Sequence, residues 1–297
     1  MLGKLVKYDF KSVSKVMGLL AAITGGYALL CAIMLQTPVY ADLFSGNNDS
    51  AMVAFGGITG IFGFIALFLI IAGVNVASVI YLGVRFFKSM YDDEGYLTHT
   101  LPATGWERLG AKLITASIWI FIIRLTIIVS CGLIVISFII IAARNGVDVS
   151  EAMNDIKNVI VNDIFPYKEY AEFFVKATVH AVIYGVFYLF LSPFIEVAHV
   201  FGALSVGQCF KKNRGFIGIV IYFAISWGTN LVLTIVRGII QASEFKRMTA
   251  LDAEGISGYM TRTVFLNYDL QLIVNLVISI ILVYVAHHII EDKLNLI

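Results

Sequence analysis

Charged residues are scarce in this chain. Asp, Glu, Lys and Arg make up 14% of its 297 residues, whereas soluble domains carry about 25%. Hydrophobic residues make up 59% of the chain, and the mean hydropathy is +0.88. This composition excludes an ordinary soluble globular protein and indicates an integral membrane protein.

Proline and cysteine are also rare. The chain has four prolines and no tract rich in Ser, Gly and Pro, so it offers no candidate for a flexible linker. We therefore expect a single membrane domain over residues 1–297. The three cysteines, Cys31, Cys131 and Cys209, lie apart in or beside apolar segments, which favours packing residues over a disulfide or metal framework. A net charge of +1 gives no general attraction to nucleic acid, and we expect no such partner.

The chain lacks the phosphate loop of a nucleotide-hydrolysing protein. Gly105 and Gly110 have the spacing of its glycines, but Ala111 stands where the loop needs Lys. Lys112 is followed by Leu rather than by Ser or Thr. The HExxH motif of zinc proteases is absent as well. We therefore expect the chain not to be an enzyme, to bind no metal or cofactor, and to leave any nucleotide chemistry to a separate subunit.

Long apolar runs are abundant. A helix needs about 20 apolar residues to cross roughly 30 Å of hydrocarbon, and a membrane β-barrel would show short alternating segments instead. The sequence predicts an all-α membrane fold with six transmembrane helices. These lie near residues 16–35, 53–84, 112–142, 173–208, 215–241 and 269–290.

The basic residues beside the runs predict the orientation. With the N-terminus inside, twelve Lys and Arg residues fall on the cytoplasmic side and seven on the other side. Cytoplasmic segments of membrane proteins carry this excess of basic residues. We therefore expect a multi-pass membrane protein with both termini in the cytoplasm.

The first fifteen residues form a basic segment of their own. Residues 3–15 place Leu5, Tyr8 and Val13 among four lysines. This pattern is typical of an amphipathic helix that lies in the membrane interface before the chain turns into the first span. We predict such a helix over residues 1–15, with a frayed basic end as the alternative.

Residues 85–111 join the second and third runs and form the longest predicted cytoplasmic segment. Thr104 and Glu107 have the spacing of a capping box, in which each side chain bonds the other residue's backbone N–H. Pro102 breaks the preceding turn. We predict a short cytoplasmic helix from Trp106 to Lys112.

The same segment carries apolar residues away from the membrane. We expect Tyr96, Leu97 and Leu101 to point toward the cytoplasm, where apolar side chains need a partner. The alternative is a solvated hairpin whose apolar residues fold back onto the membrane face.

In these features the chain resembles the permease subunits of ABC-2 type transporters, in particular those of Firmicutes. The resemblance covers the whole chain and rests on the opening MLGKLVKYDFKS, the six runs and the EGYLTHTLP segment. Eight residues of the inner segment match the family pattern: Asp93, Glu94, Gly95, Tyr96, Leu97, Thr100, Leu101 and Pro102. The resemblance implies that these residues form a coupling helix that contacts a separate ATPase, on which ATP and Mg bind. It also implies that a homodimer or heterodimer of two permeases encloses the pathway.

Two charged residues fall inside the predicted spans. Arg124 and Glu196 each lie roughly 18–20 Å from the inner surface, by a helical rise of about 1.5 Å per residue. A charge at this depth is costly unless it has a partner or faces water. An ion pair between them and a polar lining of a transport pathway are both open, and His199 shares a helix face with Glu196. Nearby, Pro193 is a candidate break in the fourth span.

These observations favour a permease subunit of an ABC-2 type exporter. A secondary transporter is an alternative, and it would show internal repeats and need no cytoplasmic partner. An intramembrane enzyme is a further alternative, for which Glu196 and His199 offer only a fragment of a catalytic cluster.

Overall fold

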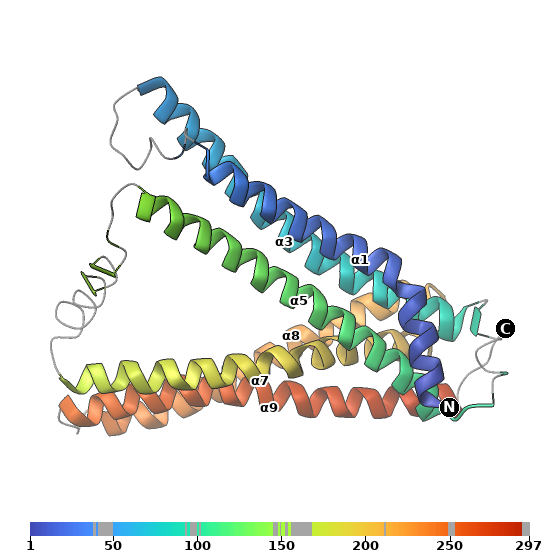
Figure 1. Cartoon of the computed structure of the whole chain (residues 1–297). Coiled ribbons are helices and arrows are strands. Elements are labelled where there is room, and N and C mark those ends of the chain that lie inside the picture. The colour runs from blue at the N-terminus through green and yellow to red at the C-terminus, as the bar shows by residue number, and fades with distance from the viewer. Residues whose placement is uncertain are drawn as a thin grey trace. The chain divides into compact units, whose positions relative to one another are not determined.

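The computed structural model describes residues 1–37, 40, 50–92, 94–95, 100, 102–144, 148, 150–151, 154–155, 168–210, 212–248 and 253–292, and these residues contain no strand. They form long helices, labelled in Figure 1: α1 (Leu2–Leu35), α3 (Ser50–Tyr91), α5 (Gly105–Arg144), α7 (Lys168–Gly207), α8 (Arg214–Met248) and α9 (Ala253–Asp292). Six helices in this part of the chain are long and apolar enough to cross a membrane. The predicted all-α fold with six candidate spans is therefore confirmed.

The helices extend beyond the apolar runs at several ends. Residues 3–15 are helical, as expected, but they belong to the same continuous helix as the first span. No proline separates the basic segment from the apolar run, so nothing in the sequence forces the helix to end there. Its predicted place in the membrane interface stays a prediction.

The candidate break at Pro193 does not occur. Proline removes one backbone donor and disturbs the preceding turn, yet α7 continues through Pro193 as far as Gly207. Pro193 is buried, and Ser192 and Ile195 beside it are buried as well. Helices in membranes tolerate proline where neighbouring groups pack around it.

The described residues divide into two compact units. The first draws on residues 1–10, 79–118 and 165–297, and the second on residues 11–78 and 119–164. We describe each unit separately below.

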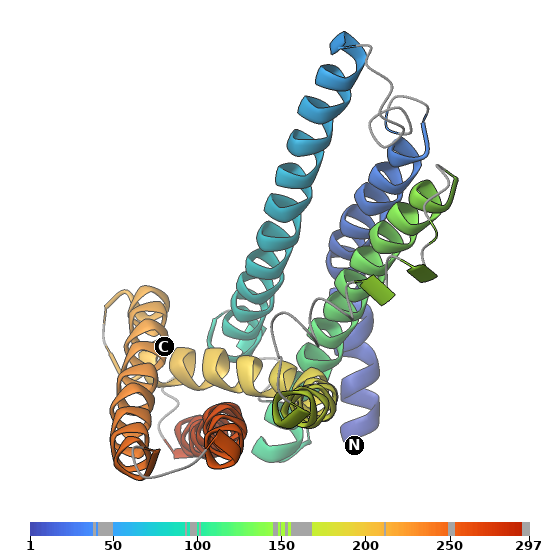
Figure 2. The same cartoon turned by 90° about the vertical axis from the view of Figure 1, so that its left-hand side faces the viewer.

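The core of the first unit is a bundle of α7, α8 and α9, in which α7 contacts both other helices extensively and α8 contacts α9 to a smaller extent. α7 and α9 run in the same direction, because His180 meets Asp269 near their beginnings and Gly202 meets Leu282 nearer their ends. Both Figure 1 and Figure 2 show these two helices side by side.

Small residues allow the closest approaches in this bundle. A Cβ atom on Gly207 would lie 2.7 Å from the backbone nitrogen of Gly218, so α7 and α8 touch backbone to backbone. A Cβ on Gly202 would lie 2.6 Å from the Cβ of Leu282 on α9. Close contacts at small residues are a common way for membrane helices to associate.

The second unit packs parts of α1, α3 and α5 around an apolar core. Its buried residues are Ala28, Leu35, Tyr40, Leu67, Ile134 and Ile141. Two hydrogen bonds cross between helices: Tyr27 donates to the backbone oxygen of Gly63 over 3.4 Å, and Gln36 donates to that of Ser137 over 3.1 Å.

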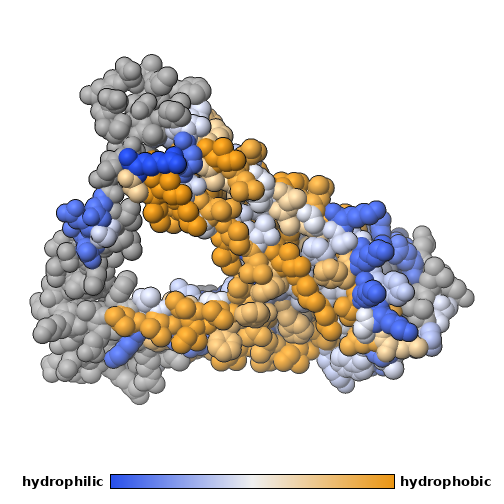
Figure 3. Space-filling model, in the orientation of Figure 1, coloured by the Kyte–Doolittle hydropathy of each residue, from blue (hydrophilic) through white to orange (hydrophobic). Residues whose placement is uncertain are grey.

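Large apolar side chains cover the outside of the spans. On α8, for example, Phe223 is 65% exposed and Trp227 is 74% exposed. Figure 3 shows hydrophobic residues in orange along the visible face of α7 and α9. Water is a poor solvent for such a surface, whereas the hydrocarbon of a bilayer is a good one.

Candidate functional site

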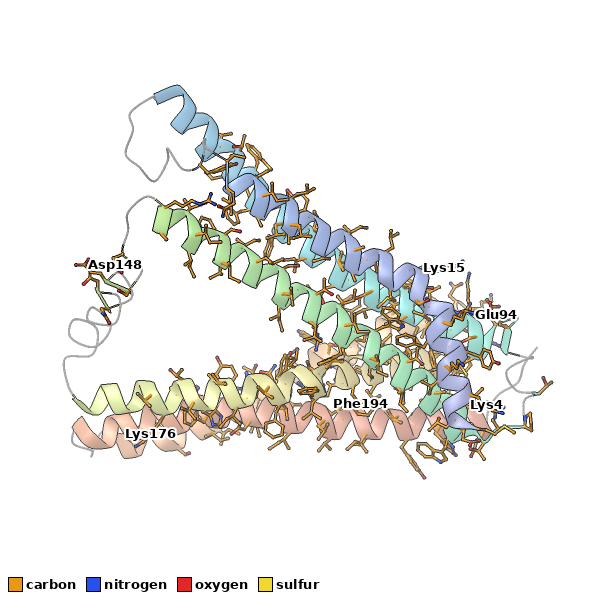
Figure 4. The ribbon with its side chains drawn as sticks, viewed as in Figure 1. Lys4, Lys15, Glu94, Asp148, Lys176 and Phe194 are labelled. Atoms are coloured by element: carbon orange, nitrogen blue, oxygen red, sulfur yellow. The ribbon has the colours of Figure 1, made fainter. Side chains whose placement is uncertain are left out.

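The connection between α3 and α5 carries all eight predicted contact residues. Glu94, Gly95, Thr100 and Pro102 are among the described residues. Asp93, Tyr96, Leu97 and Leu101 lie outside them. Glu94, Thr100 and Pro102 are exposed, and Glu94 makes an ion pair of 3.2 Å with Arg85 of α3. In Figure 4, Glu94 and Lys4 lie toward one end of the first unit, with Phe194 near the middle of α7 and Lys176 toward its other end.

The end of α3 is fixed to α7 by aromatic residues. The rings of Phe86 and Phe201 stack with centroids 3.9 Å apart and an interplanar angle of 6°. One turn further along, the buried Tyr91 hydroxyl donates to the Ser205 hydroxyl over 2.7 Å. A buried hydrogen bond of this kind is costly to break because both groups would lose their partner away from water. The start of the connection is therefore anchored on α7.

The capping box predicted at Thr104 is present. The backbone N–H of Thr104 donates to the Glu107 carboxylate over 3.2 Å, and the N–H of Glu107 donates to the Thr104 hydroxyl over 3.3 Å. The helix that it starts, however, is not the predicted short helix ending at Lys112. It is α5, which continues to Arg144, because no helix breaker separates Lys112 from the apolar run that follows.

The N-terminal part of α1 lies against this first stretch of α5. The Lys112 ammonium makes an ion pair of 3.3 Å with Asp9, with exposed side-chain fractions of 11% and 29%. A Cβ on Gly110 would lie 3.8 Å from Leu2. The predicted interfacial segment is thus joined to the helix that follows the predicted contact segment.

The last turns of α9 contact the first turn of α5. The rings of His287 and Trp106 stack with centroids 3.9 Å apart and an interplanar angle of 17°. The His287 Nε2 lies 3.2 Å from a carboxylate oxygen of Glu291. A Cβ on Gly105 would lie 2.7 Å from the same carboxylate oxygen. Both ends of the connection are therefore anchored on the α7–α9 bundle.

The three intramembrane residues of the sequence prediction fall in different surroundings. Arg124 is half-buried on α5 in the second unit, whereas Glu196 and His199 lie on α7 in the first. Glu196 is within electrostatic reach of Tyr222 on α8, and His199 is buried. The pairing of Arg124 with Glu196 stays a prediction.

Two polar contacts on the bundle were missed by sequence reasoning. His180 of α7 lies 3.3 Å from the Asp269 carboxylate of α9, and its ring stacks on Phe265. Arg237 of α8 donates to the Gln271 side chain of α9 over 2.8 Å. The available signal was the presence of these polar residues at the ends of apolar runs, but spacing within one run does not show which helices meet.

The described residues contain no group of three or more His, Cys, Asp and Glu side chains that could hold a metal ion. All three cysteines are free. Around the α3–α5 connection, the described residues make packing contacts and ion pairs. These contacts attach the ends of the connection to the neighbouring helices.

Comparison with known proteins adds no assignment: no protein-family model, curated protein or solved structure matches the chain.

Proposed function

We propose that this chain is the permease subunit of an ABC-2 type exporter, which forms half of the translocation pathway and takes its energy from a separate ATPase. The six candidate spans and the resemblance of residues 93–102 to the family segment support this proposal. The partners are an ABC ATPase that binds ATP and Mg and a second permease, identical or different. The chain itself then catalyses no reaction.

The observation that carries the proposal is the attachment of the α3–α5 connection at both ends. Tyr91, at the end of α3, bonds Ser205 of α7, and Trp106, at the start of α5, stacks on His287 of α9. A partner that moves the connection therefore displaces α7 and α9 together with it, because close-packed interiors transmit displacement with little compression. In this mechanism the closing ATPase levers the connection and switches the pathway between its two sides.

The proposed orientation places the connection in the cytoplasm of a bacterial cell, with both chain termini on the same side. It rests on the excess of basic residues beside those ends. An ATPase in the cytoplasm can then reach the apolar residues Tyr96, Leu97 and Leu101.

Arg124, Glu196 and His199 are the proposed polar residues of the pathway, with an Arg124–Glu196 ion pair as the alternative role. Charge exchange separates the two. If the residues pair, the double variant R124E/E196R recovers the expression that each single variant loses, because the opposite charges are restored. A double variant that expresses no better than the single ones contradicts the pairing.

The function is tested by purification of the tagged protein with its ATPase. We expect an ABC ATPase, recognised by its own phosphate-loop peptides in mass spectrometry, to co-purify with the wild type. With the triple variant Y96A/L97A/L101A, the amount of co-purified ATPase should fall at least about tenfold. Deleting apolar contacts worth about 1.4 kcal/mol or more weakens binding by that factor.

The matched control is W227A, which removes an apolar side chain that is 74% exposed on α8. It should express like the triple variant and retain the ATPase. The proposed function is wrong if the wild type brings down no ATPase, or if the triple variant retains both the ATPase and transport.

A further inference from the structure

Three tyrosines and an aspartate gather at one contact between α7 and α9. The ring centroids of Tyr184 and Tyr188 on α7 are 5.7 Å apart, and those of Tyr184 and Tyr268 on α9 are 5.5 Å apart. Asp269 follows Tyr268 directly and is within electrostatic reach of Tyr184. Tyr188 and Tyr268 are 46% and 52% exposed, and the Asp269 side chain is 45% exposed. These four residues, the tyrosine–aspartate cluster, are therefore open to a ligand.

The cluster and its surroundings offer one charge of each sign. In the described part of the chain, Asp269 takes part in a hydrogen bond at Oδ1 only, with His180 over 3.3 Å. Arg237 of α8, which donates to Gln271, brings a positive charge within electrostatic reach of Tyr184. Aromatic rings and a carboxylate attract an ammonium group, whereas a guanidinium attracts a phosphate. The charges therefore complement a ligand that carries both groups.

The distance along α7 puts the cluster at the level of lipid headgroups. Tyr188 and His180 lie 19 and 27 residues before Gly207, after which a polar segment follows. At a rise of about 1.5 Å per residue, these separations are about 28 and about 40 Å. The hydrocarbon of a bilayer is about 30 Å thick, and about 40–45 Å with the headgroups. With Gly207 at one boundary of the hydrocarbon, the cluster lies at the other, and Figure 4 labels Lys176 near this end of α7.

An exposed apolar stripe on α7 borders the cluster and continues toward the middle of the span. Ile183, Phe187 and Phe190 have the i, i+4, i+7 spacing of one helix face and are 51%, 61% and 63% exposed. Tyr184 follows Ile183 in the chain. A lipid whose headgroup lies in the cluster can place an acyl chain along this stripe. A soluble molecule with the same headgroup has no chain to place there, so the stripe favours a lipid.

We propose that the tyrosine–aspartate cluster binds the headgroup of a zwitterionic phospholipid. The ammonium group lies against Asp269 and the tyrosine rings, the phosphate lies toward Arg237, and one acyl chain follows the apolar stripe. In the proposed orientation of the chain, this lipid belongs to the outer leaflet. The binding itself depends neither on that orientation nor on an ATPase.

The test is lipid binding to the purified, delipidated protein, measured by native mass spectrometry without any ATPase. One probe is dioleoyl phosphatidylethanolamine, which carries both a phosphate and an ammonium group. The other is dioleoyl phosphatidylglycerol, which has the same acyl chains and the phosphate but no ammonium group. The apparent Kd of each lipid is compared between the wild type and variants of the site.

Two variants remove the ammonium contacts: D269N removes the negative charge, and Y184L/Y268L removes two rings but keeps apolar side chains. Each should raise the Kd of phosphatidylethanolamine about fivefold or more, which corresponds to about 1 kcal/mol, and leave that of phosphatidylglycerol nearly unchanged. R237Q should raise both Kd values, because both lipids carry the phosphate. The matched control is Y284L, which removes a tyrosine that is 65% exposed further along α9 and should change neither.

The proposal is overturned if D269N and Y184L/Y268L bind phosphatidylethanolamine as tightly as the wild type, or if they lose both lipids equally. Thermal unfolding in the same detergent identifies a variant that has not folded. Y188L, at an exposed position of the cluster, then takes its place with the same expected result.

A competition experiment distinguishes a lipid from a soluble ligand. Glycerophosphoethanolamine has the same headgroup but no acyl chains, and at equal concentration it should not displace the lipid. If it displaces phosphatidylethanolamine, the ligand is a soluble molecule and the lipid proposal is wrong. Because no ATPase is present, a failure of the proposed function leaves all of these outcomes unchanged.

Discussion

Gly207 is the residue at which the packing of α7 and α8 leaves the least room. An added Cβ would lie 2.7 Å from the Gly218 nitrogen, 2.8 Å from the Arg214 backbone oxygen and 2.8 Å from the Gly218 Cα. All three atoms belong to the backbone, so no side-chain rotation relieves the overlap.

We therefore expect G207A to lower the free energy of unfolding by about 1–3 kcal/mol, the usual cost of overpacking. Thermal unfolding in detergent measures the effect. The control is G185A on the same helix, where a Cβ meets nothing within 4 Å. That substitution should be neutral or should stabilise by up to about 1 kcal/mol through helix propensity. Equal unfolding temperatures for both variants would show that α7 and α8 do not touch at Gly207.

Asp148 offers a second test at the level of a single residue, in the second unit. Its carboxylate accepts hydrogen bonds from the Ser150 hydroxyl over 2.6 Å and from the N–H groups of Ser150 and Glu151 over 2.8 and 3.3 Å. These bonds favour the ionised form and hold the pKa of Asp148 below its ordinary value.

Because the folded pKa is the lower one, the local stabilisation is present above the unfolded pKa and disappears as the pH falls through the folded pKa. The carboxyl-carbon chemical shift of labelled Asp148 reports this titration. The variant S150A should raise the pKa of Asp148, since it removes the hydroxyl donor. An unchanged titration in S150A would contradict the hydrogen-bonded arrangement, and S130A, at a buried position of α5, serves as the control.

At the scale of the element, two ion pairs attach neighbouring segments of the first unit and differ in burial rather than in length. Asp9 and Lys112 lie 3.3 Å apart with 29% and 11% of their side chains exposed. Arg85 and Glu94 lie 3.2 Å apart with 36% and 51% exposed. Water screens the second pair far more than the first.

We therefore expect D9N to cost about 2 kcal/mol of stability, somewhat less than the roughly 3–5 kcal/mol for a fully buried pair. E94Q should cost less than about 1 kcal/mol. Chemical unfolding of both variants in the same detergent measures the difference, and added salt should reduce the effect of E94Q. If E94Q proves as costly as D9N, α1 is not held to α5 by a buried ion pair.

The helices themselves were predictable from sequence because each depends on local information. Hydropathy located the six candidate spans, and the spacing of Thr104 and Glu107 predicted the capping box. The predicted end of that helix at Lys112 was wrong because the interpretation assumed a boundary where the polar segment meets the apolar run. A change of polarity does not interrupt backbone hydrogen bonds, and the helix continues.

The contacts that attach the α3–α5 connection could not be predicted in the same way. Trp106 and His287 lie far apart in the chain, and neither occurs in a motif with fixed spacing. His287 lies near the end of the last apolar run, where its position in the sequence does not show its partner. Which helix it touches depends on how α5 and α9 pack, and a single sequence does not specify helix pairing.

At the scale of the whole molecule, the six candidate spans and the excess of basic residues predict on which side of the membrane each connection between the spans lies. Three spans separate Lys4 from Asp148, and one more separates Asp148 from Lys212. An odd number of crossings puts two positions on opposite sides of the membrane, and an even number puts them on the same side. Basic residues near Lys4 and Lys212 predict that this shared side is the cytoplasm.

Cysteine labelling of intact cells tests both the number of crossings between these positions and the side on which each position lies. In a C31S/C131S/C209S background, a membrane-impermeant maleimide should label D148C from outside, whereas K4C and K212C should react only after permeabilisation. Labels in the reverse order would keep the number of spans and overturn the orientation, and with it the access of a cytoplasmic ATPase to residues 92–104. Labelling of K4C and K212C from opposite sides would mean that one of the four helices between them does not cross the membrane.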